Sequence, residues 1–95
     1  SAGEEVAIPA KVFPGAFPGE FLVEIDTADG PVSGFVRESD VRNVNINEHS
    51  GYVRATIESF DSHSVKVLIS GSFFTTNGIA YLSSSWAQSN LQQVA

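Results

Sequence analysis

The chain has 95 residues, of which 42% are hydrophobic, 11% aromatic and 17% charged, and these values indicate one small globular domain. Its net charge of −6 rests on only five scattered cations, which excludes the basic cluster that nucleic acids and anionic membranes require. Cysteine is absent, so disulfides, thiol nucleophiles and thiolate metal sites are excluded as well.

The start of the chain, SAGEE, lacks the basic segment and the apolar core of a signal peptide. No apolar run approaches the ~20 residues of a membrane-spanning helix. The expected location is the cytoplasm, and the fold predictions leave out Ser1–Gly3 as a remnant of either cloning or processing.

In the first half, runs rich in Val, Ile and Phe alternate with turn residues, which predicts short strands. The expected strands are Val6–Phe13, Phe21–Thr27, Val32–Arg37 and Val44–Asn47. Asp29–Gly30 is a strong hairpin signal, and RESDVR (37–42) predicts a single helical turn. Pro9 cannot donate a ladder hydrogen bond, which places the first strand at a sheet edge or a bulge.

The second half repeats this kind of pattern. The expected strands are Tyr52–Phe60, Val65–Ile69, Ile79–Leu82 and Leu91–Val94. Asp61–His63 forms a tight turn, Asn77–Gly78 ends the connection GSFFTTNG, and SSSWAQSN (83–90) predicts a turn capped by serine.

The two halves, 6–47 and 52–94, resemble each other when strands are aligned. IPAKV matches VRATI, LVEI matches SVKV, and SGFV matches NGIA. Either an internal duplication or the few residue types that strands admit explains this match. In both cases each half is too small to bury its own face, so 1–95 is expected to form a single domain around one core.

The stretch SGFVRESDV (33–41) resembles the end of SH3-like small barrels, where a glycine-apolar strand leads through one 3₁₀ turn into a closing strand. The resemblance implies an all-β fold, a small SH3-like barrel of six to eight short strands. The Pro and Tyr of the SH3 motif are absent from this stretch, so the binding of proline-rich peptides does not transfer with the fold.

Catalytic and metal-binding signals are weak. Asp61, Ser62 and His63 are consecutive turn residues whose side chains diverge, whereas a catalytic triad needs side chains that converge from separate elements. His49 follows Glu48 in a linker, and the spacing of the two histidines does not predict a zinc site. Paired carboxylates on one strand face can serve glycosidase-type chemistry, but an ordinary solvent-facing strand has the same pattern. No metal and no cofactor is expected.

Aromatic residues are the strongest binding candidates. Phe13, Phe17, Phe73 and Phe74 lie in or beside loops, and Phe13 and Phe17 belong to the repeated FPGAFPGE (13–20). Loop aromatics occur at recognition surfaces, but they also cap open barrel ends. Trp86, the sole tryptophan, has the same two interpretations. We expect Phe13 to point inward and Phe17 outward.

The sequence therefore predicts a non-enzymatic protein-binding or assembly module that uses these aromatics and an acidic rim. Its expected partner is another protein or a second copy of the chain, with no nucleic acid and no membrane. Two alternatives stay open: a small hydrolase or lyase with carboxylates and histidine at the barrel mouth, and a small-ligand pocket lined by Phe and Trp86.

Overall fold

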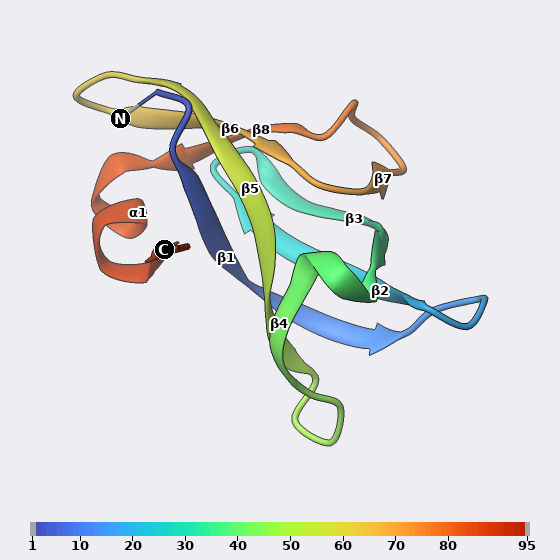
Figure 1. Ribbon diagram of the computed structural model, residues 1–95. Coiled ribbons are helices and arrows are strands. Elements are labelled where there is room, and N and C mark those ends of the chain that lie inside the picture. Colours follow the sequence, from blue (N-terminus) through green and yellow to red (C-terminus); the bar gives the residue numbers. More distant parts are fainter. Residues whose placement is uncertain (1, 95) are drawn as a thin grey trace.

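The computed structural model describes residues 2–94, so Ser1 of the excluded segment Ser1–Gly3 lies outside the described part of the chain. Strands dominate these residues, with one helical turn and one short helix (Figure 1). The elements are β1 (Glu5–Pro14), β2 (Glu20–Thr27), β3 (Gly30–Arg37), η1 (Glu38–Asp40), β4 (Val41–Asn45), β5 (Ser50–Phe60), β6 (Ser64–Ile69), β7 (Ser72–Phe73), β8 (Ile79–Ser83), α1 (Ser84–Asn90) and β9 (Gln92–Gln93).

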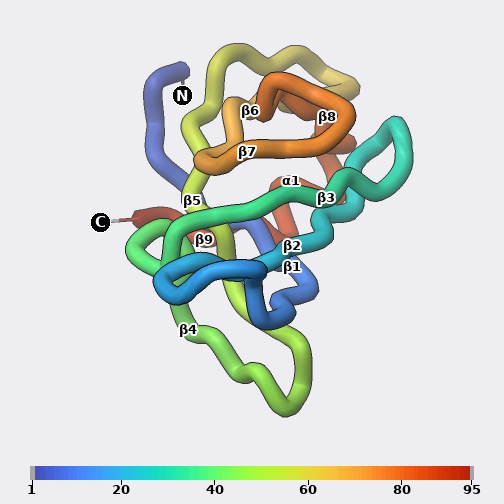
Figure 2. Tube along the Cα trace, turned by 90° about the vertical axis from the view of Figure 1, so that its right-hand side faces the viewer, coloured from blue at the N-terminus to red at the C-terminus, as the bar shows by residue number. Residues whose placement is uncertain are grey.

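All strands join one antiparallel sheet in the order β7-β3-β2-β1-β5-β6-β8, with β4 paired to β5 and β9 paired to β1. The sheet curls because β7, which lies in the connection between β6 and β8, pairs with β3 from the other end of the order. Figure 2 shows β7 beside β3 after this curling. The prediction of an all-β small barrel is confirmed, in the form of a half-barrel.

The edge prediction for Pro9 is wrong, because β1 lies inside the sheet between β5 and two further strands, β2 and β9. The amide of Val12 donates to the carbonyl of His49 at 3.1 Å, so the even-numbered residues of β1 bond toward β5. Pro9 is odd-numbered and faces the other side, in the gap between the β9 and β2 ladders. Its missing amide therefore costs no ladder hydrogen bond.

Side chains alternate along the strands, so one apolar face of the sheet points into the barrel. The core consists of Val6, Ile8, Val12, Val23, Ile25, Val36, Val53, Ala55, Ile57, Val67, Ile69, Phe73, Ala80, Leu82 and Ala87. The buried face of β2 carries Val23 and Ile25, and that of β5 carries Val53 and Ala55.

The C-terminal segment forms more regular structure than predicted. Residues Ser84–Asn90 are an α-helix of seven residues rather than a turn, and the hydroxyl of Ser83 caps it by accepting from the amide of Trp86 at 3.2 Å. The helix buries Ala87 against the core. The two-residue strand β7 was not predicted, because Ser72–Phe73 is too short to show an alternating pattern.

The order of elements recurs in the two halves, apart from β7: three strands, a helical segment and a short strand. The closing strand of each half pairs with the first strand of the other half, β4 with β5 and β9 with β1. Both halves thus contribute to one core, while their origin by duplication stays a prediction.

Candidate functional site

The five predicted aromatic residues lie in different surroundings. Phe17, at the tip of the β1–β2 hairpin, is 70% exposed, and Phe74, just after β7, is 61% exposed. Phe73 is buried in the core, and Trp86 is half-buried on α1. Phe13 is half-buried. The outward orientation predicted for Phe17 is thus correct.

The inward orientation predicted for Phe13 is wrong. Val12 is fully buried and occupies the inward position, so the next residue of the strand projects to the outer face. There the ring of Phe13 stacks on the imidazole of His49, with ring centroids 4.6 Å apart. Phe13 therefore caps no barrel end.

Strand register carries an apolar row across the outer face of the sheet. Phe13 on β1 lies opposite Leu22 on β2, Leu22 lies opposite Phe35 on β3, and Phe35 lies opposite Ser72 on β7. Directly opposite side chains in antiparallel pairs have Cβ atoms about 4.5–5.5 Å apart, so neighbours in this row are spaced for side-chain contact. The row spans roughly 15 Å, given a strand spacing of ~4.8 Å.

Aromatic contacts extend this row at both ends. The ring of Phe74 meets Phe35 edge to face, with centroids 5.4 Å apart, and the amide of Phe74 donates to Ser33 at 2.9 Å. At the β1 end, Nδ1 of His49 lies 3.3 Å from the carbonyl oxygen of Val12. We define the aromatic stripe as His49, Phe13, Leu22, Phe35 and Phe74.

Charged side chains flank the aromatic stripe on both sides. On one side Lys11 and Glu24, opposite each other across β1 and β2, form an ion pair at 3.6 Å. On the other side Glu20 lies opposite Arg37, and the Oε1 atom of Glu20 also accepts from the amide of Phe17 at 3.2 Å. A surface hollow of about 380 Å³ adjoins this second flank, and it is lined by Glu20, Phe35, Arg37, Asp40, Gly71 and Ser72.

The histidines lie apart from each other in turns. His49 has a positive φ of 52° and stacks on Phe13, whereas the backbone amide of His63 donates to the carboxylate of Asp61 at 2.7 Å. The amide of Ser64 donates to the same oxygen at 2.8 Å. These two hydrogen bonds, that of His63 first, lower the pKa of Asp61 below its ordinary value. The carboxylate is therefore engaged as a turn acceptor, and the hydrolase or lyase alternative stays a prediction.

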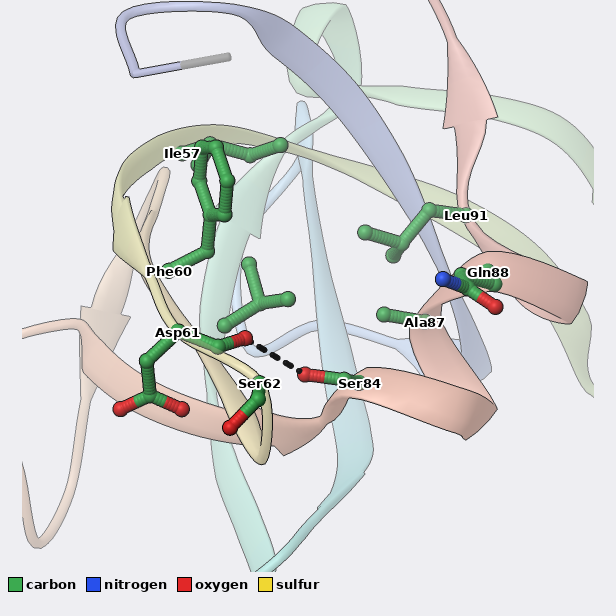
Figure 3. A pocket seen from close by; sticks show the side chains of 9 residues that line it. Ile57, Phe60, Asp61, Ser62, Ser84, Ala87, Gln88 and Leu91 are labelled. Carbon is green, nitrogen blue, oxygen red and sulfur yellow. Dashed lines mark hydrogen bonds between the residues drawn. The ribbon is translucent and has the colours of Figure 1, made fainter.

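A second surface feature lies at the end of the barrel, between the β5–β6 hairpin and α1 (Figure 3). It is a groove of about 330 Å³ in which Phe60 and Ile57 face Ala87 and Leu91. The hydroxyl of Ser84 donates to the carbonyl of Asp61 at 3.2 Å and ties its two walls together. The groove is apolar, with no charged group besides Asp61 in its lining.

Trp86 borders hollows whose lining contains no phenylalanine. It borders two small hollows of about 150 and 290 Å³, and Asp26 lines both of them. The small-ligand alternative, with Phe and Trp86 around one pocket, stays a prediction.

Within residues 2–94, no three His, Asp or Glu side chains gather closely enough to hold a metal ion. No helix in the same range has the length and apolar character of a membrane span. Comparisons of the chain with protein-family models, with curated proteins and with solved structures found no match. The functional proposal therefore rests on the geometry of the outer face of the sheet.

Three members of the aromatic stripe were not among the predicted binding residues: Leu22, Phe35 and His49, which the sequence placed in a linker. Leu22 shares its strand face with Glu24 and Asp26, and Phe35 stands in a strand rather than in a loop. The available signal was alternation itself: with Val23 and Val36 inward, Leu22 and Phe35 must point outward. Their alignment across strands depended on the register, which a single strand pattern does not give.

Proposed function

We propose that this protein is a non-enzymatic protein-binding or assembly module whose contact surface is the aromatic stripe. The observation that carries the proposal is the register that aligns Phe13, Leu22 and Phe35 on the outer face of three neighbouring strands. Aromatic side chains are enriched at interface centres and among the residues that dominate binding energy.

Energetic magnitudes indicate that a partner must cover the whole stripe. Full burial of one large apolar side chain contributes about 1.5–3 kcal/mol. Association costs an estimated ~4–15 kcal/mol in lost freedom of motion. The exposed ring of Phe74 alone cannot offset that cost, whereas several stripe residues buried together can.

The charges around the stripe favour specificity and encounter rate over affinity. The chain carries a net charge of −6, and Glu20 and Glu24 lie on the two flanks of the stripe. Each flank places an acid opposite a base, Glu24 with Lys11 and Glu20 with Arg37, so the rim attracts opposite charges on a partner and rejects like ones. The protein is a small all-β half-barrel, and we propose the SH3-like type for it on the resemblance of residues 33–41.

Photo-crosslinking tests this function. With p-benzoylphenylalanine in place of Phe74, we expect a discrete covalent adduct with another protein chain in the cells that make this protein. The matched control carries the same group in place of Tyr81, which is 42% exposed on the outer face of β8. Adduct formation at position 81 but not at 74, or no adduct at either position, would overturn the proposal.

A further inference from the structure

We propose that the partner on the aromatic stripe is a second copy of this chain, related by a two-fold axis that runs parallel to the strands between β2 and β3. This inference rests on the proposed function, because it specifies the occupant of the same surface. Outward-facing residues form three rows that run across the strands. The inference follows from which residues of one copy would face which residues of the other under that symmetry.

Such an axis places each β2 residue against the β3 residue of the same row in the other copy. In the central row, Leu22 meets Phe35 of the second copy, and Phe35 meets Leu22. Further out, Phe13 lies over the small side chain at Ser72 of the second copy. Apolar therefore meets apolar at the centre, and a large side chain meets a small one at the margin.

The charged row has the same self-complementarity. Glu20 on β2 and Arg37 on β3 occupy one row, so each meets the opposite charge of the other copy, twice over by symmetry. Arg37 belongs to neither of the ion pairs formed between described side chains, Lys11–Glu24 and Arg54–Asp40. Its guanidinium is thus available to a carboxylate across an interface.

The third row distinguishes this axis from the perpendicular one. With the axis parallel to the strands, Lys11 lies over the ring at Phe74 of the second copy, a cation–π arrangement. With the axis across the strands, Glu20 would lie over Glu24 of the other copy, and like charges in an interface are costly. Charge therefore selects the parallel axis.

The dimer is expected to be weak. Three rows on four strands cover roughly 15 by 14 Å, which is small beside the ~800 Å² that each partner buries in a standard interface. The net charge of −6 on each copy adds repulsion. Aligned sheets also twist by about 30° relative to each other. The residues of β2 and β3 lie nearest the axis, so they are the best matched between the two copies.

Charge reversal tests the geometry by sedimentation velocity at rising protein concentration. Glu20→Arg and Arg37→Glu should each weaken the wild-type dimer at least about tenfold, because each replaces two attractive contacts with two repulsive ones. An equimolar mixture of the two variants should dimerise again, since every cross-copy contact then joins opposite charges. The double variant should dimerise alone.

Several results would overturn the inference. These are a wild-type chain that stays monomeric up to high micromolar concentration, single variants that still dimerise, or a mixture that does not recover. Thermal melts establish that each variant folds. Should Glu20→Arg fail to fold, Glu20→Gln keeps the acceptor for the amide of Phe17 and should still weaken the dimer several-fold.

The proposed function and the dimer can fail separately. A monomeric wild-type chain whose crosslinker at position 74 captures a different protein keeps the stripe as a binding surface and rejects the second copy. Captured adducts of twice the chain mass, together with recovery in the mixture, support both.

Discussion

Single residues on this sheet take their roles from alternation. Val12 and Phe13 are consecutive and both apolar, yet the first is fully buried and the second stacks on His49 outside. The sequence indicated which positions alternate, but it did not indicate which of two adjacent apolar residues faces the core. Packing decides this, because Val12 fits among the β-branched residues that fill the small interior.

Asp61 provides a residue-level prediction of pH dependence. Its folded pKa is lowered by hydrogen bonds from the amides of His63 and Ser64, so the unfolded chain binds more protons in acid. The contribution to stability is fully present above the ordinary aspartate pKa of about 3.9 and is lost as pH falls through the folded value.

Asp61→Asn keeps an oxygen acceptor and removes the charge. We expect the variant to melt below the wild type at neutral pH, with the difference closing as pH falls below about 4. Melting curves by circular dichroism from neutral to acidic pH measure this difference. Two curves that stay parallel throughout would contradict the role given to the carboxylate.

Most strands and turns were predictable at the scale of elements, because runs of β-branched and aromatic residues end at Gly, Asn and Asp. The Asp29–Gly30 turn and the helical turn at Glu38–Asp40 are examples. The edge prediction from Pro9 was wrong because a proline shows only that one ladder hydrogen bond is missing. It does not show that β1 changes its neighbour from β9 to β2 at that residue. Such a change is set by tertiary structure.

Closure of the half-barrel depends on the contact between β3 and β7. A Cβ atom at Gly34 would overlap the carbonyl oxygen of Ser72 and lie 2.7 Å from Cα of Phe73. We therefore expect Gly34→Ala to lower the free energy of unfolding by about 1–3 kcal/mol, the usual cost of overpacking.

Urea unfolding measures that loss, with Ser33→Ala as the control next to it in β3. Because residue 33 faces outward, its truncation should change stability far less. Equal stability of Gly34→Ala and the wild type would show that β7 does not press against β3 in solution.

At the scale of the whole molecule, the halves exchange their closing strands, and one wall of the resulting barrel carries the aromatic stripe on its outside. The expectation of strands followed from the apolar runs between turn residues, and that of a small barrel from the resemblance of residues 33–41. The proposed contact surface did not follow from the sequence, because it joins four strands whose order and register arise from the curled sheet. Phe13 and Phe74 were binding candidates from the sequence, but Leu22 and Phe35 join them into one surface only in the folded chain.

The most direct test of the stripe as an assembly surface is a dilution series followed by amide NMR spectra of the wild-type chain. We predict that concentration-dependent shifts gather at residues 20–24 and 33–37, while the amides of Leu68 and Tyr81 on the outer face of β6 and β8 stay unchanged. Spectra that do not vary with concentration, or shifts centred on β6 and β8, would contradict it.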